Sequence, residues 1–159
     1  QQIKKRFPFV DYCIWSTSTL MPYMHHIPNL NLMFVDVERE VAESVFNLLN
    51  SDGNKRVFLQ PSLIEIERYI GTNDAIIIRP LISESPLQLV EGISTPTIEK
   101  ILVDMVGDVE FSFLQRSERN YVYTTIFERH SVNKNKLLRY ATRRGRKEEV
   151  EKLINANKL

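Results

Sequence analysis

The chain has 159 residues, of which 43% are hydrophobic and 26% are charged, and its formal net charge is +1. The length suits one domain, and the composition is typical of folded globular proteins and excludes a wholly disordered chain. No apolar run reaches the roughly 18 residues of a transmembrane helix, and the single cysteine excludes an internal disulfide framework. We therefore expect a cytoplasmic protein that has no membrane partner.

Short apolar runs rich in β-branched and aromatic residues predict strands in the first 90 residues. A proline-containing loop over residues 16–29, with one short helix at most, separates the first two runs. The runs are short and largely continuous, which is typical of strands that are buried on both faces of a sheet. The expected strands are 10–15, 32–35, 57–59, 75–78 and 87–90.

Helical spacing predicts a helix directly after the second strand. Asp36 is placed to cap this helix, and the polar turn at residues 50–54 ends it. Glutamates in the first turn suit the positive end of the helix dipole. The apolar positions that repeat at helical spacing are Val37, Val41, Val45, Leu48 and Leu49.

A second short helix is predicted between the third and fourth strands. Ser62 and Glu65 have the spacing of a capping box, in which each side chain bonds the backbone of the other residue. Gly71 ends this helix. Its expected buried stripe consists of Leu63, Ile66 and Ile70.

The second half of the chain is predicted to be helical. Thr95 and Pro96 are typical of the cap and first position of a helix, whose apolar face includes Ile101 and Met105. Asn133 is a cap for a later helix, and Gly145 ends it before a last helix over 148–154. Together these patterns predict an α/β (α+β) fold, with a mixed sheet of about five strands, flanking helices and a C-terminal helical layer.

The charges are unevenly distributed along the chain. Residues 1–120 carry 11 basic and 16 acidic side chains, whereas residues 121–159 carry 10 and 4. Between Arg129 and Lys147 there is no acidic residue. Because Lys and Arg on helix faces neutralise phosphates, this segment predicts binding to nucleic acid or to an acidic protein. The expected binding residues are Lys134, Lys136, Arg139, Arg143, Arg144, Arg146 and Lys147.

An alternative hypothesis is a metal-dependent nuclease or nucleotidyltransferase. Asp36 and Glu38 follow a buried strand and can hold Mg²⁺, with Asp11 as a third acid. Neither a Gly-Ser turn ahead of the pair nor a Glu-x-Lys pattern accompanies them, and a helix cap with acids in its first turn explains the same residues.

Other reactive residues lack the spacing of a site. Cys13 lies in an apolar run that is typical of a small core residue. The neighbouring His25 and His26 do not have metal-ligand spacing. With five glycines and no glycine-rich phosphate loop, the chain carries no signal for a bound nucleotide cofactor, and we expect no cofactor.

Two segments resemble a known family. They are GISTPTIEKILVD at 92–104 and LLRYATRRG at 137–145. In order and spacing they are similar to the C-terminal domain of AbiEi-like proteins, the antitoxins and transcriptional regulators of type IV toxin–antitoxin (abortive infection) systems. In that family a Thr-Pro precedes an acidic residue and a Leu-(Val/Leu)-Asp helix, and a downstream helix carries an alanine and basic residues before a glycine. The stretch 32–49 is similar to members from Bacteroidetes.

The resemblance implies a non-enzymatic bacterial repressor. It implies an N-terminal winged-helix module that binds operator DNA, with residues 1–9 as the linker from it. It further implies a single α/β domain over 10–159, whose basic helical part at 129–159 adds to DNA binding. The functional counterpart would be a nucleotidyltransferase-like toxin that forms no stable complex with the antitoxin. No catalytic residues are implied.

Overall fold

The computed structural model describes residues 2–51, 53, 56–71 and 73–159. Gln1 of the expected linker and Asp52 and Asn54 of the expected turn lie outside the described residues. Where one domain was expected, the chain divides into two compact units. Unit 1 comprises residues 1–18, 29–83 and 89–95, and unit 2 comprises residues 19–28, 84–88 and 96–159.

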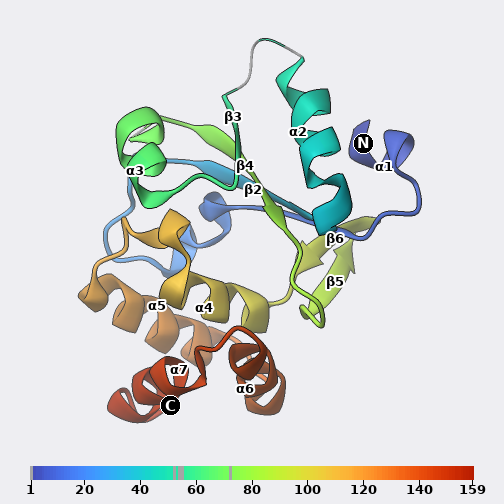
Figure 1. Cartoon of the computed structure of the whole chain (residues 1–159). Coiled ribbons are helices and arrows are strands. Elements are labelled where there is room, and N and C mark those ends of the chain that lie inside the picture. The colour runs from blue at the N-terminus through green and yellow to red at the C-terminus, as the bar shows by residue number, and fades with distance from the viewer. Residues whose placement is uncertain (1, 52, 54–55, 72) are drawn as a thin grey trace. The chain divides into compact units, whose positions relative to one another are not determined.

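Unit 1 is built on a mixed four-stranded sheet in the order β1-β2-β4-β3 (Figure 1). β1 pairs antiparallel with β2, whereas β2 and β3 both run parallel to β4. The mixed α/β class is as predicted, and four of the five expected strands form this sheet. Their bounds are β1 (Tyr12–Ser16), β2 (Leu32–Val37), β3 (Val57–Leu59) and β4 (Ala75–Pro80).

The fifth expected strand lies in a separate hairpin. β5 (Leu87–Val90) pairs with β6 (Ile93–Pro96) in a two-stranded sheet. β6 was not predicted, because Thr95 and Pro96 within it also have the pattern of a helix start. α4 (Ile98–Gly107) instead begins after Thr97, whose hydroxyl donates to the Pro86 carbonyl at 3.1 Å.

One face of the sheet carries an apolar core. Alternate residues of each strand point to the same face, and Val35, Val37 and Ile78 pack there with side chains of α2 (Ala42–Asn50). α1 (Gln2–Arg6) contributes Ile3, which is 6% exposed. Within the expected linker, Ile3 and Phe7 therefore pack against the core of unit 1. The core members are Ile3, Val35, Val37, Ala42, Val45, Leu49, Val57 and Ile78.

Asp36 does not cap the following helix, which corrects the prediction. It lies within β2 and is buried, with its carboxylate bonded to Arg79 of β4. The chain turns into η3 (Arg39–Val41) and then α2, and neither has a side-chain cap bond. A buried carboxylate is stabilised by a bidentate guanidinium, and Asp36 therefore pairs with Arg79 inside the sheet, where the strand extends through this residue.

The capping box is confirmed: the Glu65 amide donates to Ser62 Oγ, and the Ser62 amide donates to Glu65 Oε1. It begins α3 (Leu63–Glu65), which continues as the π-helix η4 (Ile66–Ile70). Leu63, expected in the buried stripe, is 42% exposed. Ile66 and Ile70, the other two members of the expected stripe, are buried as predicted.

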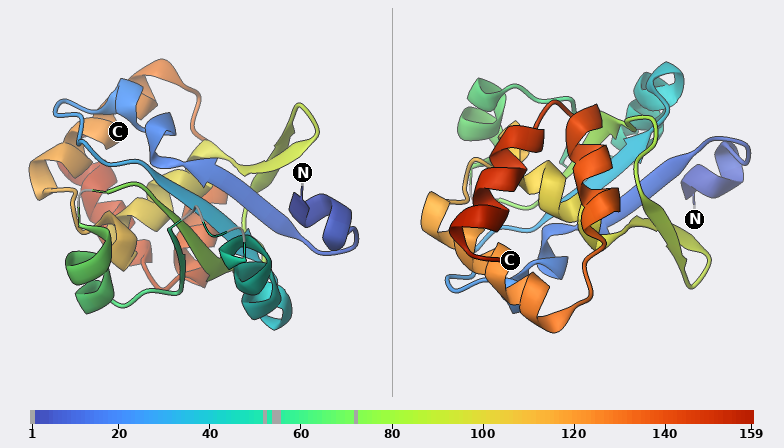
Figure 2. Two further views of the ribbon diagram at one scale, coloured as in Figure 1. Left: turned by 90° about the horizontal axis from the view of Figure 1, so that it is seen from above. Right: turned by 90° about the horizontal axis from the view of Figure 1, so that it is seen from below.

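Unit 2 is helical. α4 is the central helix and contacts α5, α6 and α7, and α6 and α7 lie side by side (Figure 2). Every residue of α4 from Glu99 to Val106 is buried. In the described part of the chain, no helix is long and apolar enough to cross a membrane. The other elements are η1 (Thr17–Thr19) at the unit boundary, η2 (Met21–Tyr23), η5 (Val109–Phe111), α5 (Arg116–Arg129), α6 (Lys134–Arg143) and α7 (Lys147–Ala156).

The burial of Ile3 predicts that the N-terminal helix stabilises unit 1. Ile3→Ala should lower the free energy of unfolding by about 2–5 kcal/mol, because the truncation removes buried methyl groups and leaves a cavity. The exposed Lys5→Ala in the same helix is the control and should change it by less than about 0.5 kcal/mol. Urea denaturation measures both. Equal effects of the two variants would mean that α1 adds nothing to the core.

Candidate nucleic-acid interface

α6 begins and ends where its sequence predicts. The Asn133 side chain accepts from the Lys136 amide at 3.0 Å, which confirms the cap. At the other end the Gly145 amide donates to Thr142 and the Arg146 amide donates to Ala141, the two bonds of a Schellman motif. Gly145 has φ +69°, a backbone conformation that glycine adopts without strain. This turn reverses the chain into α7.

The basic side chains around this turn point inward, to a buried carboxylate of α4. Asp104 is fully buried. Its Oδ2 accepts from Lys100 Nζ at 2.6 Å, and its Oδ1 accepts from Arg144 at 2.7 Å and from the Tyr140 hydroxyl at 2.8 Å. Two cations and a phenol thus surround one carboxylate, which balances its charge in the low dielectric of the interior.

Asp108 extends this ionic cluster by one turn of α4. Its Oδ1 accepts from Arg144 and from Arg146, both at 2.6 Å. Burial alone lowers the pKa of the Arg144 guanidinium, but the carboxylates of Asp108 and Asp104 outweigh that effect and raise the pKa above its ordinary value. Burial, and then the negative charge of Asp104, raise the pKa of the Tyr140 phenol. At neutral pH both groups therefore stay protonated and donate.

The remaining predicted binding residues lie on the surface. Lys136, Arg139 and Arg143 are exposed, and their spacings of three and four place them on one face of α6. No side-chain partner of Lys136 or Arg139 is found among the described residues. Lys134 donates to the C-terminal Leu159 carbonyl at 3.0 Å. Lys136, Arg139 and Arg143 are called the α6 basic face below.

At the start of α7, Lys147 is exposed and has an acidic neighbour. Its ammonium lies 3.8 Å from the Glu151 carboxylate, in a solvent-exposed pair. Such pairs contribute little free energy, and the ammonium of Lys147 remains accessible to an anion. Of the seven predicted residues, five are thus at the surface, and Arg144 and Arg146 are bonded to carboxylates of α4.

The alternative metal site finds no geometric support. Arg79 donates to both oxygens of Asp36, at 2.8 and 2.9 Å, and its guanidinium lies 4.3 Å from the Phe34 ring centroid. A bidentate guanidinium occupies the oxygens that a metal ion would need. Glu38 instead accepts from the backbone amide of Asp11. Among the described residues, no group of three or more His, Cys, Asp or Glu side chains could hold a metal ion.

Cys13 and the two neighbouring histidines belong to different units of the chain. Cys13 is buried in β1. The backbone amides of His25 and His26 donate to the buried Glu118 carboxylate of α5, at 3.1 and 2.7 Å. Glu118 thereby orders the loop ahead of β2, which is a structural role.

The sequence analysis missed the roles of Asp104 and Asp108. In the sequence, Lys100 and Asp104 were considered only as part of the segment 92–104 that resembles AbiEi-like proteins, and no buried role was predicted for them. A signal was present, since Lys100, Asp104 and Asp108 recur at intervals of four along a largely apolar segment. Charged residues at core positions indicate buried pairing, because an unpaired buried charge is strongly unfavourable.

The cluster predicts that Asp104→Asn destabilises unit 2 strongly. The amide would remove the negative charge that Lys100 and Arg144 bind, and breaking a buried ion pair costs about 3–5 kcal/mol. The matched control is Glu148→Gln, which breaks the exposed pair with Lys152 and should cost less than about 1 kcal/mol. Urea denaturation followed by tyrosine fluorescence measures both. Similar losses in the two variants would disprove a stabilising role of the cluster.

The comparisons with known proteins give a family but no activity. The whole chain, residues 1–159, matches a protein family described as a family of unknown function (DUF6577). Comparison with curated proteins and with solved structures finds no match for this chain. The chain therefore belongs to this family of unknown function.

Proposed function

We propose that this domain is a non-enzymatic regulator that binds the phosphate backbone of nucleic acid through the α6 basic face. The observation that carries the proposal is the composition of α6, which has four exposed cations and no acid over ten residues. On most surface helices acids alternate with bases, and the charges balance locally. Here Lys136, Arg139 and Arg143 share one face.

The ionic cluster supports the same surface by holding α6 in place. Tyr140 and Arg144, one turn apart on α6 and its C-terminal cap, bond Asp104 on α4. These bonds anchor α6 to α4, and the exposed cations are carried on a fixed helix. A preordered set of cations loses less conformational entropy on binding than the same charges on a mobile segment.

A more specific proposal is that the protein is an antitoxin-like transcriptional repressor. It rests on the resemblance of residues 92–104 and 137–145 to AbiEi-like antitoxins, and its partners would be operator DNA and a nucleotidyltransferase-like toxin that forms no stable complex with it. Contacts to phosphates carry no base information. We therefore expect this chain to bind duplexes of different sequence with similar affinity.

The test is fluorescence anisotropy of the 159-residue chain with a random 20-base-pair duplex, at 25–200 mM NaCl. The triple variant Lys136→Gln, Arg139→Gln, Arg143→Gln should weaken binding at low salt at least about tenfold. The slope of log K against log [salt] should fall by about one to three units, since each phosphate contact contributes about 0.9.

The control removes three exposed cations from unit 1 and so matches the change in net charge. Lys5→Gln, Arg6→Gln, Arg68→Gln should bind duplex DNA as the wild type does. If both triple variants lose affinity equally, binding reflects net charge rather than the α6 basic face. If the wild type does not bind at 25 mM salt, the proposal is wrong, and an acidic protein becomes the expected partner of this surface.

A further inference from the structure

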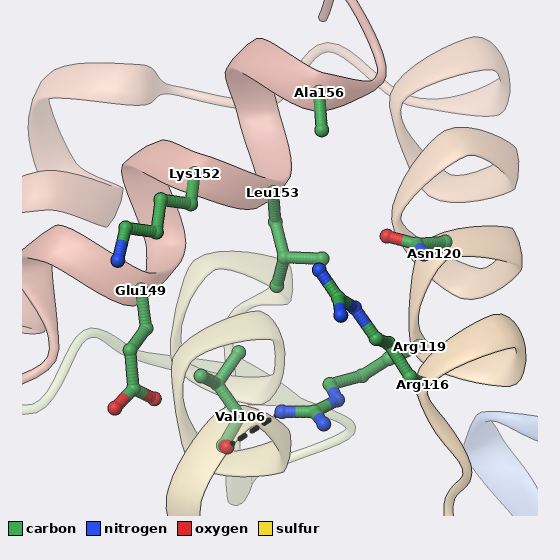
Figure 3. A pocket seen from close by; sticks show the side chains of 8 residues that line it. All are labelled: Val106, Arg116, Arg119, Asn120, Glu149, Lys152, Leu153 and Ala156. Carbon is green, nitrogen blue, oxygen red and sulfur yellow. Dashed lines mark hydrogen bonds between the residues drawn. The ribbon is translucent and has the colours of Figure 1, made fainter.

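A second cationic feature of unit 2 lies away from the α6 basic face. A pocket of about 240 Å³ is formed by residues of α4, α5 and α7 (Figure 3). It is smaller than the roughly 300–1,000 Å³ typical of sites for drug-sized ligands, so it suits a small molecule. Its lining residues are Val106, Arg116, Arg119, Asn120, Glu149, Lys152, Leu153 and Ala156.

Two arginines extend into this pocket from the first turn of α5. Arg116 and Arg119 are three residues apart, so their side chains leave the same face of the helix. Arg119 donates to the Val106 carbonyl at 3.0 Å, which orients its guanidinium and leaves its other N–H groups for a ligand (Figure 3). No hydrogen-bond or ion-pair partner of the Arg116 side chain is found among the described residues.

The α7 side of the pocket adds one cation and one anion. Lys152 lies 3.3 Å from Glu148, and both side chains are mostly exposed, so this weak pair can open. Glu149 points into the pocket and makes no ion pair with either arginine (Figure 3). The lining thus includes three cations and one carboxylate, and it carries an excess of positive charge.

We propose that this pocket binds a small phosphate monoester. Paired guanidinium groups match the geometry of phosphate oxygens and bind them through two parallel hydrogen bonds. Val106, Leu153 and Ala156 give the pocket an apolar wall for the carbon part of the ligand. The Glu149 carboxylate can accept a hydrogen bond from a hydroxyl group of the ligand. A sugar phosphate has both the phosphate for the arginines and a hydroxyl for Glu149. This inference does not depend on DNA binding by α6.

The test is an NMR titration of the ¹⁵N-labelled 159-residue chain with ribose 5-phosphate, inorganic phosphate and ribose. The sugar phosphate should shift the backbone amides of residues 116–120 and 149–156, and ribose should not. Arg116→Gln should raise the Kd about tenfold or more, because it removes a hydrogen-bond donor that carries charge. The matched control is Lys158→Gln, an exposed cation of unit 2 outside the pocket, which should leave the Kd unchanged.

The outcomes separate the sources of the phosphate group. Tighter binding of ribose 5-phosphate than of inorganic phosphate supports a sugar phosphate, and equal binding supports the phosphate group with the free ion as ligand. The proposal is overturned if neither shifts these amides, if ribose shifts them equally, or if Arg116→Gln binds as the wild type does. It is also overturned if only a 5′-phosphorylated oligonucleotide binds, since the pocket would then extend the nucleic-acid interface.

Discussion

The buried carboxylate of Asp104 is the constraint on which the helical unit depends. It lies on the central helix α4 and is bonded to Lys100 on its own helix and to Tyr140 and Arg144 of α6. The desolvation of an ion is unfavourable by several kcal/mol unless opposite charges and hydrogen bonds surround it. The positions of α4 and α6 are therefore coupled, because any movement that separates them breaks the bonds from Tyr140 and Arg144 to the buried carboxylate.

This constraint divides the basic segment between two roles. Arg144 and Arg146 flank Gly145 in the Schellman turn, and their side chains bond Asp104 and Asp108. Lys136 and Arg139 lie on the exposed face of the helix. The same residue types, a few positions apart, thus stabilise the fold on one side of α6 and present positive charge to solvent on the other.

The ionic cluster also joins the two segments that carry the family resemblance. Residues 92–104 contribute Lys100 and Asp104, and residues 137–145 contribute Tyr140 and Arg144. Buried groups that bond each other are constrained by packing, whether or not they contribute to binding. The motif residues that meet here therefore describe how α4 and α6 pack, and the proposed binding of phosphates rests instead on the exposed cations.

Local patterns in the sequence determined most of the secondary structure. The capping box of Ser62 and Glu65, the cap at Asn133 and the turn at Gly145 each depend on residues within one or two helical turns. Strand runs such as 75–78 were likewise recognisable, because β-branched side chains favour an extended backbone. These signals predicted a mixed α/β fold with a helical C-terminal part and the location of an exposed basic helix.

Tertiary structure alone decided which charged groups are buried and with which partners. Asp36 was predicted to be a helix cap or a metal ligand. Instead, its carboxylate is buried in the sheet and bonded to Arg79, which lies 43 residues away in the sequence. The same holds for Arg144 and Asp104, and for the pocket in which Arg116 and Arg119 face α7. Such pairings join distant segments, and the free energy of a charge depends on the dielectric and the counter-charges around it. The dielectric and the counter-charges around a group are not defined until the chain has folded.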